Sequence, residues 1–73
     1  MRIKKSIKKV LKSYLSKIND VDIKTQIEFL LYGIFDKEDL ISLYYDIESL
    51  FKLNGDIIYK ELLSILRSLI LAS

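Results

Sequence analysis

A chain of 73 residues with neither cysteine nor histidine has the size of one small domain, and it lacks the side chains for disulfides and for most metal sites. Its hydrophobic content of 51% is high, yet no uncharged stretch approaches the roughly 18 to 20 residues that span a bilayer, so we predict a cytoplasmic protein with no membrane span. The formal net charge is +2, but residues 1–18 hold seven of the twelve cations and none of the ten acidic residues.

Apolar residues recur at helical spacing along almost the whole chain, and no sustained alternating run indicates a strand. Three short polar breaks divide this pattern, which predicts helices over about residues 3–18, 21–35, 37–53 and 57–71. Because the connections between these helices are short, we expect a single all-α domain over residues 1–73, built as a small antiparallel four-helix bundle.

The first predicted helix is amphipathic and strongly basic. Its apolar residues form a stripe suited to a core, namely Ile3, Ile7, Val10, Leu11, Tyr14, Leu15 and Ile18. Cations occupy the opposite face, with serines between them; they are Arg2, Lys5, Lys8, Lys9 and Lys12. Lysines suit sequence-independent contact with phosphates, and this face lacks the several Arg, Asn or Gln residues that read base edges. We therefore take it as the candidate site for double-stranded DNA or another polyanion.

The second and third predicted helices each follow a polar residue that can cap them. Asp20 precedes the second helix, and Asp36 precedes the third, where Asp39 is placed to complete a variant of the capping box. Several large apolar residues lie off the core stripes of these helices, which makes them candidates for a protein interface. They are Phe29, Tyr32, Ile41 and Tyr45.

The fourth predicted helix follows the clearest break in the chain, Leu-Asn-Gly-Asp at residues 53–56. Gly55 can adopt the left-handed conformation that closes a helix, and Asp56 can cap the helix that follows. The apolar face of this last helix covers roughly 160°, which is wide enough for one neighbouring helix and a partner chain. We therefore expect a homodimer, and we add Leu63 and Ile70 to the interface candidates.

The same break resembles the second half of an EF-hand calcium loop over about a dozen residues. The residues that match that pattern are Asn54, Gly55, Ile57 and Glu61. The first and third loop positions would be Leu50 and Lys52, which cannot ligate calcium. A glycine-closed turn followed by an aspartate cap explains the same residues, so we predict no metal site.

Little in the sequence supports catalysis. The chain has no serine in a nucleophile-elbow pattern and no glycine-rich phosphate loop. Its carboxylates cluster at predicted helix starts, where the helix dipole stabilises them. We expect a non-enzymatic protein without catalytic residues, metal ligands or cofactors.

Two functions remain open at this point. The first is a regulatory or nucleic-acid-associated dimer that contacts phosphates through the basic face of the first predicted helix. The second is a protein–protein interaction module, such as an inhibitor, an immunity-type protein or an adaptor, that uses the exposed aromatics and the wide face of the fourth helix. The simpler alternative is that the lysines only balance acids of the two middle helices, and a further one is that the basic helix rests on an anionic membrane.

Overall fold

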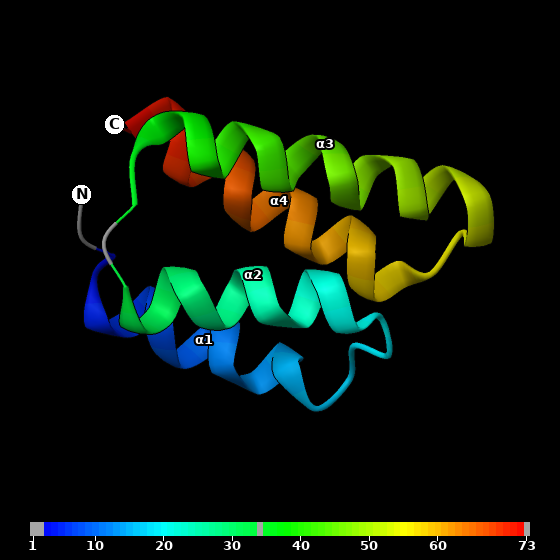
Figure 1. The fold of residues 1–73 in the computed structure, drawn as a ribbon, viewed down its shortest axis with the longest axis horizontal. Coiled ribbons are helices and arrows are strands. Elements are labelled where there is room, and N and C mark those ends of the chain that lie inside the picture. Colours follow the sequence, from blue (N-terminus) through cyan, green and yellow to red (C-terminus); the bar gives the residue numbers. More distant parts are fainter. Residues whose placement is uncertain (1–2, 34, 73) are drawn as a thin grey trace. The chain divides into compact units, whose positions relative to one another are not determined.

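Four helices make up most of the protein in the computed structural model, which describes residues 3–33 and 35–72 (Figure 1). They are α1 (Lys5–Leu15), α2 (Val21–Tyr32), α3 (Lys37–Asn54) and α4 (Ile57–Ala72). The described residues include no strand, so the predicted all-α class is confirmed. None of the helices in this part of the chain combines the length and the apolar character that crossing a bilayer requires.

The helices form two units, and the boundary between them lies between Phe35 and Asp36. In the first unit α1 packs against α2, and in the second unit α3 packs against α4. The buried apolar side chains of the first unit are Ile3, Leu11, Ile18, Ile23, Ile27, Leu30, Leu31 and Phe35. Those of the second unit are Leu40, Leu43, Ile47, Tyr59, Leu62 and Leu66. Within each helix most of them recur every three or four residues, which is the spacing of one helix face.

Helix α1 is shorter than the predicted range of residues 3–18. Its N-cap is Lys4, which makes no side-chain capping bond, and the first turn contains no acidic residue. Both features leave the first N–H groups and the positive end of the helix dipole without a stabilising partner. At the other end, the Lys17 N–H donates to the Tyr14 carbonyl at 2.9 Å, a bond spanning three residues that closes the helix in a turn.

Two members of the predicted α1 stripe show how packing modifies the helical pattern. Ile18 lies beyond the end of α1 but is only 3% exposed, so it belongs to the core although it is not helical. Val10 was predicted to face the core and is 44% exposed. This prediction was wrong because packing against α2 buries only part of the wide apolar stripe of α1.

Helix α2 ends at Tyr32 instead of continuing to residue 35 as predicted. Gly33 adopts an extended conformation, and its N–H donates to the Phe29 carbonyl at 2.7 Å. Glycine disfavours the helical state, and Asp36 must itself be extended to serve as the N-cap of α3. The chain therefore leaves the helix before Phe35, which is buried outside it.

Side-chain caps begin α2 and α3 as the sequence predicted. The Asp20 carboxylate accepts from the Ile23 N–H at 3.0 Å. At the start of α3 the Asp36 carboxylate accepts from the Asp39 N–H at 3.0 Å, while the Asp39 carboxylate accepts from the Asp36 N–H at 3.0 Å. This reciprocal pair is a capping box, which fixes the residue at which α3 begins.

Gly55 closes α3 in the left-handed conformation, with a φ of 66°. Its N–H donates to the Phe51 carbonyl at 2.7 Å. Immediately afterwards the Asp56 carboxylate accepts from the Ile58 N–H at 3.0 Å, so the turn that ends α3 also begins α4. Glycine closure and aspartate capping are both confirmed.

Replacing Gly55 by alanine is expected to lower the free energy of unfolding by about 1 kcal/mol, because an L-residue is strained in the left-handed region. A Cβ at this position meets no atom within 4 Å, so the cost comes from the backbone alone. Gly55→Asn should lose less, since asparagine tolerates this conformation. Urea unfolding followed by circular dichroism measures the free energy of unfolding of both variants. An alanine variant as stable as the native protein would contradict the left-handed conformation of Gly55.

Candidate nucleic-acid interface

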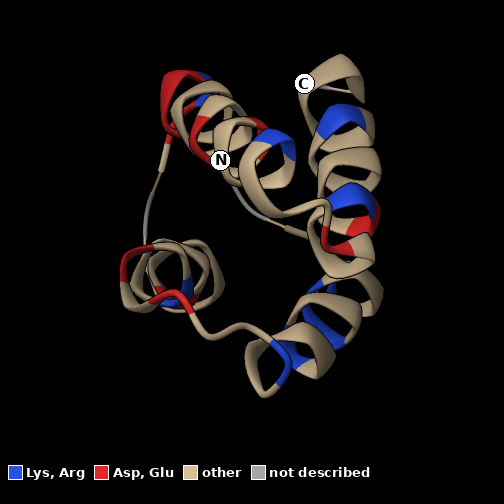
Figure 2. Cartoon of the chain, turned by 90° about the vertical axis from the view of Figure 1, so that its right-hand side faces the viewer, with Lys and Arg blue, Asp and Glu red and all other residues tan. Residues whose placement is uncertain are grey.

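The predicted basic face of α1 lines a surface hollow that it shares with α2. The hollow has a volume of about 360 Å³, and it is lined by Lys5, Lys8, Lys9, Lys12, Leu31 and Tyr32. We call these six residues the lysine hollow. All of them belong to the first unit. Figure 2 shows the blue of Lys and Arg recurring along α1. Arg2, the fifth cation of the predicted site, lies outside the described residues.

Helical geometry places the four lysines together. Each of them lies three or four residues from two of the others, the spacing that places side chains next to one another on one face of a helix. Lys8 is half-buried, and the other three are exposed. Since a lysine stem can cover apolar surface while its ammonium group stays in water, the hollow combines an apolar floor with a cationic surface.

Tyr32 brings an aromatic ring to this basic surface. The Lys12 Nζ lies 5.5 Å from the centroid of the Tyr32 ring, within the range of a cation–π contact. The Tyr32 side chain is nevertheless 70% exposed. The sequence assigned Tyr32 to a protein interface and Lys12 to a nucleic-acid site, whereas the structure brings the two side chains together.

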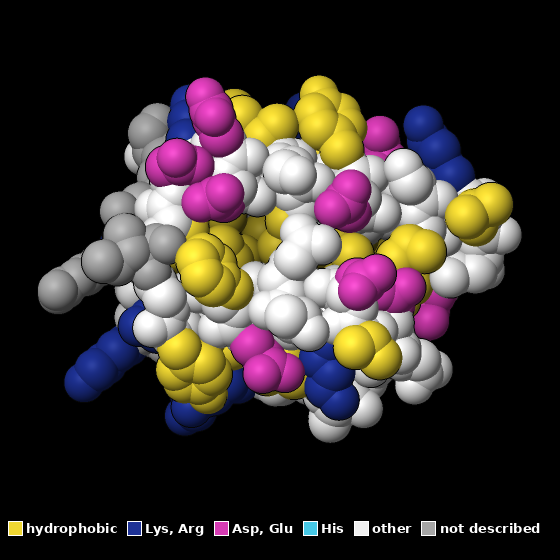
Figure 3. Space-filling view, viewed as in Figure 1, with side chains coloured by type: hydrophobic (Ala, Val, Ile, Leu, Met, Phe, Trp, Pro, Cys, Tyr) yellow, Lys and Arg dark blue, Asp and Glu magenta, His cyan; other side chains and the backbone are white. Residues whose placement is uncertain are grey.

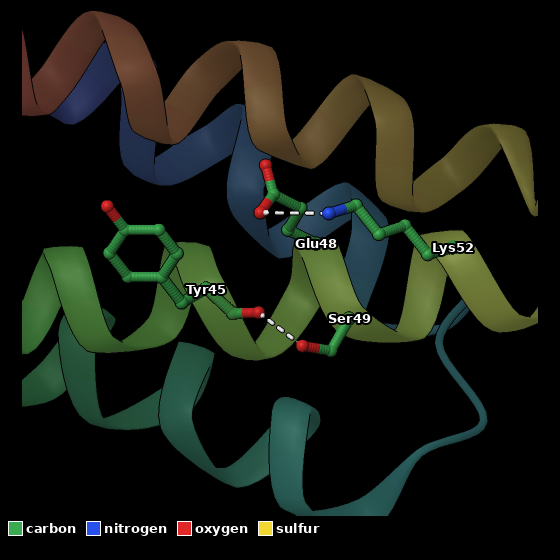
Figure 4. A network of polar contacts seen from close by, with 4 residues as sticks. All are labelled: Tyr45, Glu48, Ser49 and Lys52. Carbon is green, nitrogen blue, oxygen red and sulfur yellow. Dashed lines mark hydrogen bonds and ion pairs between the residues drawn. The ribbon is translucent and has the colours of Figure 1, made fainter.

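The lysines of the hollow are not ion-paired with the acids of α2. Within residues 3–33, no carboxylate lies at ion-pair distance from them. By contrast, Lys52 of α3 lies 3.8 Å from the Glu48 carboxylate, as Figure 4 shows. Any charge balance between these lysines and α2 therefore does not involve direct ion pairs.

A second hollow lies on the other unit, between α3 and α4. It has a volume of about 460 Å³ and is lined by Ile41, Tyr44, Tyr45, Arg67, Ile70 and Leu71. The Tyr44 and Tyr45 rings meet edge to face, with their centroids 5.8 Å apart. On α3 the Ser49 hydroxyl donates to the Tyr45 backbone carbonyl at 3.0 Å (Figure 4).

The predicted protein-interface residues are divided between the two units. Ile41, Tyr45 and Ile70 line the α3/α4 hollow, whereas Phe29 and Tyr32 belong to α2 in the first unit. Leu63 is half-buried on α4 and does not line the hollow. On the face in Figure 3, hydrophobic side chains reach the surface in separate patches with charged side chains among them.

Comparison with known proteins adds no functional assignment. No protein-family model matches the chain, and neither the curated proteins nor the solved structures contain a significant match. Among the described residues, no three acidic side chains gather closely enough to hold a metal ion. The two hollows are therefore the features of the protein that bear on its function.

Proposed function

We propose that this protein is a non-enzymatic, regulatory protein of the cytoplasm that binds nucleic acid, or a related polyanion, through the basic face of α1. The observation that carries the proposal is the lysine hollow, in which four lysines and no carboxylate line one surface. Lysine and phosphate attract each other without regard to base sequence, and binding releases the counterions condensed on the nucleic acid.

The composition of the hollow favours contact with the phosphate backbone over reading of base edges. Its lining contains no Arg, Asn or Gln, whose planar side chains form many of the bidentate bonds to bases. Its lysines also repel one another, since pairs such as Lys8 and Lys12 lie four residues apart on one helix. A bound phosphate relieves this repulsion, so binding should also stabilise α1.

The arrangement of the two units is part of the proposal. We expect the two helix pairs to complete an antiparallel four-helix bundle and two copies to associate as a homodimer. Large exposed apolar side chains support association, among them Leu71 at 77%, Val21 at 73% and Ile57 at 60% exposure. Sedimentation velocity over a range of protein concentrations tests whether the homodimer forms. A monomer mass at every concentration would exclude the dimer.

A second candidate function is supported by the α3/α4 hollow. Tyr45 is 60% exposed beside Arg67, and Tyr and Arg are among the residues most enriched at the energetic centres of protein interfaces. The α3/α4 hollow and the lysine hollow have no lining residue in common. The substitution Tyr45→Ala should then weaken target binding and leave nucleic-acid binding unchanged.

Fluorescence anisotropy of a labelled duplex of about 20 base pairs, titrated at several salt concentrations, tests the proposed function. If all four lysines of the hollow contact phosphates, the logarithm of the binding constant should fall with the logarithm of salt concentration with a slope of about −3.6. The absence of binding to duplex and to single strands at low salt would exclude this function and direct attention to the α3/α4 hollow.

A further inference from the structure

The lysine hollow combines cations with an exposed aromatic ring. Binding to the phosphate backbone of a duplex uses the cations and does not use the ring. We propose that its preferred ligand is single-stranded nucleic acid, with an unpaired base stacked on Tyr32 and the adjoining phosphates held by the lysines. This inference rests on the proposed function, and it specifies the class of nucleic acid.

The Tyr32 ring is suited to stacking because it is 70% exposed at the edge of the hollow. Stacking on an aromatic side chain is available to every base, so it requires no hydrogen-bonding groups for base edges. In a duplex the base faces are already stacked on one another and cannot reach the ring. The residues that line the hollow therefore favour a strand whose bases are unpaired.

The lysines lie where such a strand needs them. The Lys12 Nζ lies over one face of the Tyr32 ring, 5.5 Å from its centroid, so a base would stack on the opposite face with this cation close by. From Lys5 to Lys12 the helix rises about 10 Å, enough to follow a short run of phosphates. The hollow, at about 360 Å³, is within the size range of small-ligand sites and has room for a base.

Phe29 extends the aromatic surface along α2. It lies three residues before Tyr32, so the two side chains are neighbours on the helix, and it is 55% exposed. A Cβ at residue 33 would lie 2.8 Å from the Phe29 carbonyl oxygen and 3.3 Å from the Phe29 ring, so glycine is the residue that fits beside Phe29. Tyr32 and Phe29 together offer surfaces for two successive bases.

The variant Tyr32→Trp gives a direct test, since the native chain contains no tryptophan. It is titrated with an oligothymidylate of about a dozen nucleotides, with an abasic strand of equal length and charge, and with a duplex. We expect the oligothymidylate to quench the tryptophan fluorescence and to bind about tenfold more tightly than the abasic strand. The abasic strand and the duplex should leave the fluorescence unchanged.

Substitutions at the same position separate stacking from phosphate contact. Tyr32→Ala should bind the oligothymidylate and the abasic strand equally well, whereas Tyr32→Phe should keep the tenfold preference. The matched control is Tyr45→Trp, because Tyr45 is similarly exposed, at 60%, but lies on α3. Its fluorescence should not respond to the oligothymidylate.

Three results would overturn the inference. Equal binding of the base-bearing and abasic strands, without quenching, would exclude stacking on Tyr32 and leave the proposed phosphate contact intact. Tighter binding of the duplex than of the single strand would show that the lysines serve backbone contact alone. Absence of binding to all three ligands at low salt would exclude the proposed function together with the inference.

Discussion

Replacing Ile47 by alanine is expected to lower the free energy of unfolding by about 3 kcal/mol. Ile47 lies in the middle of α3 and is 0% exposed. The substitution removes three buried carbon atoms and leaves a cavity that the neighbouring side chains fill only in part. A chain of 73 residues has little stability to lose, so this variant should be partly unfolded even without denaturant.

Graded and matched variants identify burial as the cause of this loss. Ile47→Val should lower the free energy of unfolding by about 1 kcal/mol, since it removes one methyl group. Leu53→Ala on the same helix removes a side chain that is 82% exposed, and its effect should stay within about 0.5 kcal/mol. Urea unfolding followed by circular dichroism measures all three variants. An Ile47→Ala loss as small as that of Leu53→Ala would contradict the buried position of Ile47.

Features set by short-range interactions were predictable from the sequence. The capping box of Asp36 and Asp39 and the left-handed Gly55 each involve residues within a few positions of one another. Their stabilising bonds therefore depend on local sequence and hardly on the rest of the fold. The same holds for the lysine face of α1, because helical periodicity alone places its members on one side.

Features set by packing between helices were not predictable in this way. Val10 has the spacing of a core residue, and its exposure depends on how α1 lies against α2. The contact between Lys12 and Tyr32 joins two helices whose relative register no local pattern determines. For this reason the sequence assigned the aromatic ring and the lysines to different functions, although they line one hollow.

The double substitution Lys8→Glu and Lys12→Glu is expected to weaken nucleic-acid binding about 100-fold or more at low salt. It removes two of the four cations that line the lysine hollow and puts two anions in their place. On duplex DNA each lysine that contacts a phosphate contributes about 0.9 to the salt dependence, so the magnitude of the slope should fall by about two. Anisotropy titrations of the same oligonucleotides at several salt concentrations give both quantities.

Loss of binding by this double variant should not arise from loss of folding. Neither Lys8 nor Lys12 belongs to the buried core. A glutamate at position 8 is favoured by the positive end of the helix dipole, and it attracts Lys4. A glutamate at position 12 lies in the last turn of α1, where the helix dipole disfavours a negative charge. Because these effects are small and opposed, we expect a helical content and an unfolding midpoint close to those of the native protein. Circular dichroism of both proteins checks this.

The matched control for Lys8→Glu with Lys12→Glu is Lys37→Glu with Lys60→Glu, which changes two exposed lysines on α3 and α4. Each double variant exchanges two positive charges for two negative ones, so both take the formal net charge from +2 to −2. If binding depends on the lysine hollow, the control should keep most of its affinity and an unchanged salt slope. An equal loss in both variants would show that net charge governs binding and that the hollow is not the site. Retention of binding in both would place the phosphate contacts elsewhere on the protein.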